Sequence, residues 1–197
     1  MIRRLLTVLP VVLVLGACAA PGTTPQTWPG PPSVSPVPGL VSPTVLPTCP
    51  PSGVRMRFTD GDAAMGLRVV GLTLTNCGAR DYRVSGYPVL RPLDADRAVL
   101  DVTVLPGVTE ISSGLEQLDF PDREVVLAPG QAASAVVAWR NTYDDTTHGP
   151  VNVDSVSVSP QEGRPFQTVT PDHPFDLGST GRLGVTRWEA DSTSPSS

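Results

Sequence analysis

Lysine is absent from this sequence of 197 residues, and all 14 of its basic residues are arginine. The absence excludes enzymes that form a Schiff base on lysine and nucleotide-binding proteins whose P-loop needs a lysine. Acidic residues outnumber basic ones by 19 to 14, so the net charge is −5. Because nucleic-acid binding requires a basic surface, we expect no nucleic-acid partner.

Long helical stretches are also lacking, since 23 prolines and 18 glycines interrupt the chain. Short runs of alternating apolar and polar residues recur instead, separated by turn signals. This pattern predicts an all-β fold over residues 49–188, and we favour an immunoglobulin-like antiparallel β-sandwich. The expected strands are Val54–Thr59, Gly66–Asn76, Tyr82–Val84, Val89–Leu93, Ala98–Val104, Val125–Leu127, Ala133–Trp139, Asp154–Val158, Phe166–Val169 and Leu183–Trp188.

Two segments of this region depart from simple alternation. In the strand expected over Gly66–Asn76, Leu67 and Val69 alternate on one face, and Leu72 and Leu74 follow out of step. A shift of phase beside a glycine predicts a β-bulge near Val70-Gly71. The segment Leu105–Asp122 has no clear period, and we favour a cover for a sheet edge over a binding surface.

The chain begins with Arg3-Arg4 and an apolar run over residues 5–17, followed by Cys18. A helix of that run would span about 20 Å, less than the ~30 Å of a bilayer core, so a secretory signal peptide is expected over residues 1–17. Leu15-Gly16-Ala17-Cys18 resembles the bacterial lipoprotein box, in which the cysteine receives a diacylglyceryl group and becomes the new N-terminus. The resemblance implies a lipid anchor at Cys18 on the extracytoplasmic face of the cell membrane.

Residues 18–48 are rich in proline, serine and threonine, and no charged residue occurs between Ala19 and Val54. Such a composition cannot bury a core and favours a disordered, extended linker. The polar tail over residues 189–197 is also expected to be disordered. Removal of residues 1–17, which include Arg3 and Arg4, changes the net charge from −5 to −7.

Three cysteines are present in the sequence. With Cys18 assigned to the lipid, Cys49 and Cys77 remain, and a pair of cysteines outside the cytoplasm is most simply a disulfide. Two free thiols are the alternative. A bridge would tie the entry of the folded region to the end of the second strand.

Residues capable of catalysis or metal binding are few, because the chain holds only two histidines, His148 and His173. Asp144, Asp145 and His148 form the densest polar cluster and are weak candidates for a metal site. Adjacent side chains on an extended strand point in opposite directions, however, so a solvated loop is favoured. No motif for a catalytic serine, a zinc helix or a dinucleotide is present, so we expect no enzyme activity and no cofactor.

Three segments together resemble a known family. They are Gly66–Gly78 with Thr75-Asn76-Cys77-Gly78, then Val84-Ser85-Gly86-Tyr87-Pro88-Val89, then Val126–Ala132 running on to Trp139. Their order is similar to that of the actinobacterial secreted and lipoprotein family catalogued as domain of unknown function 4232. The resemblance implies a β-sandwich associated with the cell envelope, and it carries over no catalytic residue.

These observations predict a lipid-anchored envelope lipoprotein whose β-sandwich is a binding or structural module. The expected partners are the membrane, through the anchor, and an envelope protein or cell-wall glycan. Two alternatives remain open. One is an envelope hydrolase that uses His148 or His173, and the other is a metal-binding lipoprotein that uses the 144–148 loop.

Overall fold

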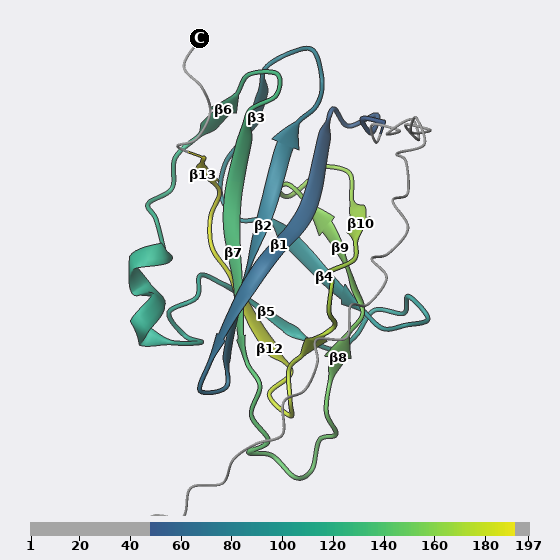
Figure 1. Ribbon diagram of the computed structural model, residues 1–197, viewed down its shortest axis with the longest axis vertical. Coiled ribbons are helices and arrows are strands. Elements are labelled where there is room, and N and C mark those ends of the chain that lie inside the picture. The colour runs from purple at the N-terminus through teal and green to yellow at the C-terminus, as the bar shows by residue number, and fades with distance from the viewer. Residues whose placement is uncertain (1–47, 192–197) are drawn as a thin grey trace, which may run out of the picture. The chain divides into compact units, whose positions relative to one another are not determined.

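The computed structural model describes residues 48–191, which form mostly β-structure arranged in several sheets (Figure 1). The expected signal peptide and nearly all of the expected linker, residues 1–47, lie outside the described residues, as do residues 192–197 of the tail. Among residues 48–191, no helix has the length and apolar character needed to cross a membrane.

The largest sheet has six strands, and its central strand is β7. Its strand order is β1-β2-β7-β12-β5, with β13 also paired to β7. The strands are β1 (Val54–Ala64), β2 (Leu67–Asn76), β7 (Ala132–Arg140), β12 (Arg182–Val185), β5 (Thr103–Pro106) and β13 (Glu189–Ala190). All pairs in this sheet are antiparallel except β12 with β5, which are parallel. The expected antiparallel fold is therefore confirmed in its coarse form, with one parallel pair at the sheet edge.

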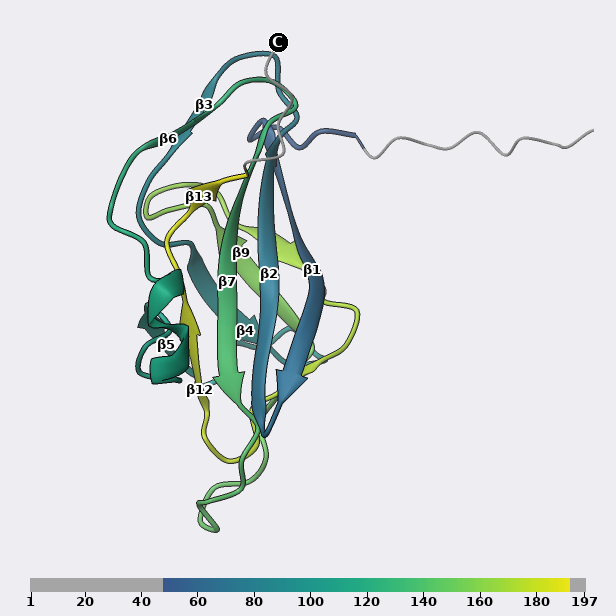
Figure 2. The same ribbon diagram turned by 60° about the vertical axis from the view of Figure 1, so that its left-hand side comes forward.

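Three smaller sheets complete the domain, and all are antiparallel. They comprise β10-β9-β4, β11-β8 and β3-β6. Their strands are β3 (Tyr82–Val84), β4 (Val89–Leu93), β6 (Val125–Leu127), β8 (Asn152–Val153), β9 (Ser155–Ser159), β10 (Gln167–Val169) and β11 (Phe175–Asp176). The three-stranded sheet faces the large sheet (Figure 2), and side chains from both contribute to one hydrophobic core.

Trp139 lies in this core and is only 4% exposed. Its ring centroid lies 4.4 Å from that of Phe175, and its indole N–H donates a hydrogen bond of 2.8 Å to the carbonyl of Asp176. Phe58 meets Phe175 edge to face, with 5.0 Å between the centroids. Such aromatic contacts stabilise the core beyond the area that they bury.

A β-bulge was predicted near Val70-Gly71 of β2, and the structure has one beside Gly71, but in the neighbouring strand β1. Strand β2 pairs with β7 in unbroken register, whereas the register of β1 against β2 shifts between Phe58 and Gly61. Thr59 and Asp60 of β1 thus lie opposite Gly71 of β2. A side chain at Gly71 would collide with the Thr59 hydroxyl, so the glycine makes room for the bulged residue.

The apparent phase shift in β2 has a different cause, because both of its faces are covered. Leu72 and Leu74 point into the main core, whereas Leu67 and Val69 contact a second apolar cluster. This second cluster is supplied by the segment after β5, which includes a short 3-10 helix over Ser113–Leu118. Its members are Val108, Ile111, Ala138, Leu105, Leu115 and Leu118, together with Leu67 and Val69. The segment therefore covers the outer face of the large sheet, not only its edge.

Some expected boundaries need correction. The strand expected over Ala98–Val104 is instead an isolated bridge between Leu93 and Val99, followed by β5, which begins at Thr103. The tail expected from residue 189 begins with an ordered strand, because Glu189 and Ala190 pair with Ser134 and Ala133 of β7. Strands β8 and β11 were not predicted, since two residues are too few to show a period.

Candidate functional site

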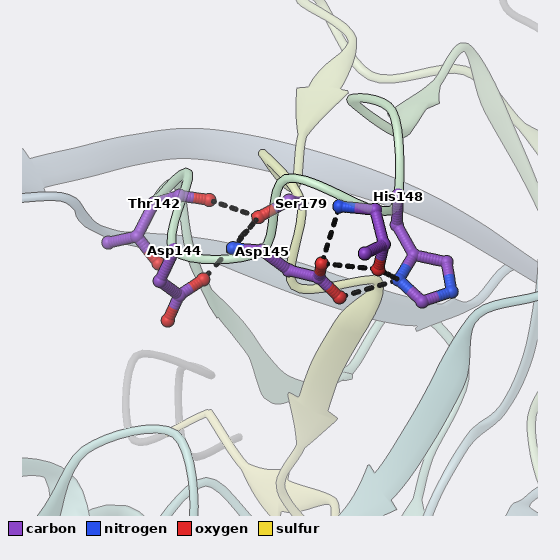
Figure 3. Close-up of polar contacts among 6 residues, drawn as sticks. Thr142, Asp144, Asp145, His148 and Ser179 are labelled. Atoms are coloured by element: carbon purple, nitrogen blue, oxygen red, sulfur yellow. Dashed lines mark hydrogen bonds and ion pairs between the residues drawn. The ribbon is translucent and has the colours of Figure 1, made fainter.

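The loop between β7 and β8 contains the three residues predicted as weak metal candidates (Figure 3). It is held to the domain by the carboxylate of Asp176 in β11. The Asn141 amide donates a hydrogen bond of 2.8 Å to that carboxylate, and the Tyr143 hydroxyl donates to it at 3.3 Å. The base of the loop therefore has a defined position on the domain.

Asp145, Thr147 and His148 form a hydrogen-bonded cluster near the tip of this loop. The Asp145 carboxylate accepts hydrogen bonds from the Thr147 N–H at 2.7 Å and from the Thr147 hydroxyl at 2.5 Å. Nδ1 of His148 lies 2.5 Å from the same carboxylate, and the other ring nitrogen points away from it (Figure 3). Both side chains are exposed, with relative accessibilities of 74% for His148 and 41% for Asp145.

The electrostatics of the cluster favour the ionised form of Asp145. The hydrogen bond from the Thr147 hydroxyl, then that from His148, hold the pKa of Asp145 well below its ordinary value of 3.8. Because Nδ1 of His148 faces the carboxylate, the imidazole is oriented by Asp145 in the way that a carboxylate orients a metal-bound or catalytic histidine. The Thr147 hydroxyl also lies 3.1 Å from Nδ1 of His148, and this is the ring nitrogen that faces Asp145.

Asp144 belongs to a separate set of contacts. Its carboxylate accepts from the Ser179 hydroxyl at 3.4 Å, and that hydroxyl accepts the N–H of Asp145 at 3.0 Å (Figure 3). The two neighbouring aspartates thus have different side-chain partners. Within residues 48–191, no group of three or more His, Cys, Asp or Glu side chains is placed to hold a metal ion.

His173 lies in a different place, on the wall of a cleft of about 420 Å³. The cleft is lined by Phe58–Ala63, Arg68–Val70, Trp139 and Pro171–Phe175. Aromatic side chains line it together with three aspartates, Asp60, Asp62 and Asp172. Sequence reasoning missed this cleft because its residues come from four separate segments, none of which carries a motif.

A second cleft, of about 500 Å³, is lined by the Ser85-Gly86-Tyr87-Pro88 motif that supported the family resemblance. The motif is fixed at two points, since the Ser85 N–H donates to the Gln161 side chain and the Trp188 N–H donates to the Gly86 carbonyl. Leu105 of β5 contributes to the opposite wall. The motif therefore forms part of a concave surface between β4 and β5.

The disulfide predicted between Cys49 and Cys77 is present, with 5.6 Å between the Cα atoms. It closes a loop of 28 residues and joins the start of the domain to the residue after β2. Cys18, the predicted lipidation residue, lies outside the described residues.

These features define a mostly β domain with a disulfide at its entry and clefts between its strands. A comparison with protein families matches residues 49–189 to the domain of unknown function DUF4232. The chain belongs to this family, and the match covers the folded region predicted from the sequence.

Comparisons with individual proteins add little. No curated protein matches the chain. Among solved structures, part of a β-glucosidase from Kluyveromyces marxianus is similar, with 10% sequence identity and a TM-score of 0.27. The similar region covers 66% of this chain and 15% of the β-glucosidase chain.

Proposed function

We propose that this chain is a lipoprotein of the bacterial cell envelope, anchored through Cys18 on the extracytoplasmic face of the cell membrane. The disulfide between Cys49 and Cys77 is the observation that carries the proposal. Structural disulfides form outside the reducing cytoplasm, and this one leaves Cys18 as the remaining thiol of the sequence. That thiol stands in the lipoprotein box Leu15-Gly16-Ala17-Cys18, where it is available to a lipid.

In this proposal the two facing sheets form an immunoglobulin-like sandwich. Its support is the shared core, to which β2 and β7 of the large sheet and β9 of the small sheet contribute. Loops gather at the ends of such sandwiches and carry binding sites.

The domain works as a binding module rather than as an enzyme. Two clefts, lined by residues of strands and of the adjoining loops, offer concave surfaces of the kind that binding sites use. As the partner we favour an envelope protein over a cell-wall glycan, because β1, which lies at one end of the strand order of the large sheet, borders one cleft and can pair with a segment of another protein.

Metabolic labelling in an actinobacterial host tests the anchor. We expect the wild-type chain to incorporate alkyne-tagged palmitate and to leave the membrane fraction only with detergent. Cys18→Ser should abolish the labelling, whereas Thr23→Ser, a conservative change nearby, should preserve it. Unlabelled wild-type protein in the cytosol, with Cys49 and Cys77 reduced, would refute the proposal.

A further inference from the structure

Strand β1 is the outermost strand on one side of the large sheet (Figure 2). In an antiparallel pair, every second residue turns its N–H and C=O away from its partner strand. The β1–β2 hairpin closes with Ala64 opposite Leu67. Counting back along β1 from this pair identifies the residues whose N–H and C=O groups face outward. Ahead of the bulge they include Val54, Met56 and Phe58, and after it they are Gly61 and Ala63.

The first half of this edge is closed by another part of the chain. The Gln167 side chain donates a hydrogen bond of 2.9 Å to the carbonyl of Val54 and accepts the N–H of Met56 at 3.4 Å. Gln167 thus occupies the place that a neighbouring strand would take. Closing an edge in this way protects a sheet against unwanted strand pairing.

The second half of the edge is open. Within residues 48–191, no other segment of the chain forms a hydrogen bond with the outward N–H or C=O of Phe58 or Gly61. The outward N–H of Ala63 is taken by the carboxylate of its neighbour Asp62, at 2.7 Å, and its carbonyl remains available. Three consecutive outward positions therefore offer hydrogen-bonding groups to a partner.

The open half borders the cleft of about 420 Å³, which Phe58, Gly61 and Ala63 help to line. Asp60, Asp62 and Asp172 also line this cleft, and all three are exposed. No ion pair among the described residues neutralises any of the three.

Two basic residues oppose these acids. Arg68 lines the same cleft and donates to the carbonyl of Leu67 at 3.2 Å, and His173 is the other basic residue on the wall. Three carboxylates thus share the cleft with one guanidinium and one imidazole. Acidic side chains therefore outnumber basic ones in this cleft, whose lining also includes Phe58 and Trp139.

We propose that the edge of β1 from Phe58 to Ala63 binds an extended segment of a partner protein as an added strand. Main-chain hydrogen bonds to the open edge supply affinity in this mode, and the adjoining cleft selects the side chains. The acidic residues that line the cleft select a basic side chain of the segment, and the aromatic residues accept an apolar one. The inference deepens the proposed binding function by naming the chemistry of the partner.

Two other occupants fit the same edge less well. A second copy of this chain, paired edge to edge, would place Asp60 and Asp62 of both copies beside each other, and like charges across a strand pair repel. The chain's own segment between Ala19 and Val54 has no charged residue and many prolines, which lack the N–H that an added strand donates.

Peptide binding tests the proposal on the complete chain carrying Cys18→Ser, so the result does not depend on lipidation. Two short blocked peptides serve as probes, one alternating valine with arginine and one alternating valine with glutamate. We expect the arginine peptide to bind about tenfold tighter or more, because several ion pairs, each weak at an exposed site, act together. It should also slow hydrogen exchange at the Phe58 and Gly61 amides.

Charge-removing variants separate the acidic walls from the general negative charge. Replacement of Asp60, Asp62 and Asp172 by asparagine removes the carboxylates that would pair with arginine. It should therefore weaken binding of the arginine peptide about fivefold or more. The matched control exchanges Asp81, Asp96 and Asp101, which are exposed elsewhere, and should leave binding unchanged.

Three results would overturn the proposal. They are no binding of the arginine peptide at millimolar concentration, equal weakening by both sets of variants, and binding without slower exchange at Phe58 and Gly61. The amides of Phe58 and Gly61 could also become protected from hydrogen exchange as the protein concentration rises, without any peptide. That result would assign the edge to a second copy of this chain instead.

Discussion

Asn76 donates a hydrogen bond of 2.7 Å to the main-chain carbonyl of Leu127, which lies 51 residues further along the chain. The same amide donates to the carbonyl of Arg80 at 2.9 Å, and its oxygen accepts the N–H of Gly78 at 3.0 Å. Asn76 is only 1% exposed, and its side chain is satisfied on both sides. It joins the end of β2, next to the disulfide, to β6.

Replacement of Asn76 by leucine should therefore be strongly destabilising. It removes three hydrogen bonds, one of them the buried bond to the carbonyl of Leu127, so we expect a loss of about 2–4 kcal/mol in the free energy of unfolding. Urea denaturation of the Cys18→Ser chain measures this loss. Asn152→Ala, at an exposed position of β8, should change stability by less than about 0.5 kcal/mol. Equal effects of the two variants would contradict this role of Asn76.

Removal of the disulfide should lower the free energy of unfolding, because the unfolded chain is then less restricted. Closing a loop of 28 residues restricts the unfolded state and contributes about 3–4 kcal/mol. We expect the double variant Cys49→Ala with Cys77→Ala to lose about that much, measured by urea denaturation under oxidising conditions. The wild-type chain with reductant should lose a similar amount, and insensitivity to reductant would argue against the bridge.

Gly71→Ala should destabilise the bulge between β1 and β2. The added methyl group meets the Thr59 hydroxyl, and overpacking of this kind is destabilising by about 1–3 kcal/mol. Thr59→Ala removes that hydroxyl, so the double variant should recover much of the loss. Thermal unfolding of the two single variants and the double variant measures the coupling. Strictly additive losses would show that Thr59 and Gly71 do not share this contact.

The Asp145 cluster should make the loop sensitive to acid. Because the pKa of Asp145 is lowered in the folded chain, its contribution to stability is present above its ordinary pKa of 3.8 and is lost as the pH falls through the lowered value. NMR titration of the carboxyl carbon follows this directly. Thr147→Val, which removes the hydroxyl donor, should raise the pKa toward the ordinary value, and His148→Ala should raise it less. An ordinary pKa in the wild-type chain would contradict the cluster.

The strands with clear alternation could be predicted from the sequence, because each buries one face. Strand β7, expected over Ala133–Trp139, illustrates this, since Ala133, Ala135, Val137 and Trp139 all lie in the main core, whereas Ala138 is the one buried residue of its other face. The prediction failed where both faces of a strand are covered. Leu67 and Val69 suggested a bulge in β2, but the segment after β5 folds over them.

The candidate sites were less accessible to sequence reasoning. The side-chain contacts between Asp145, Thr147 and His148 are local in the sequence, whereas Asp144 contacts Ser179, which lies 35 residues further along the chain. The cleft beside the β1 edge depends on the Pro171–Phe175 segment lying next to Phe58 and Gly61, more than 100 residues earlier. Such a long-range pairing leaves no periodic signal in one sequence.

Mass spectrometry of the N-terminal peptide of the mature protein tests the lipid anchor most directly. We predict a peptide that begins at Cys18 and carries a diacylglyceryl group on its sulfur. A peptide that begins at Met1, or one that contains Cys18 as a free thiol, would contradict the account.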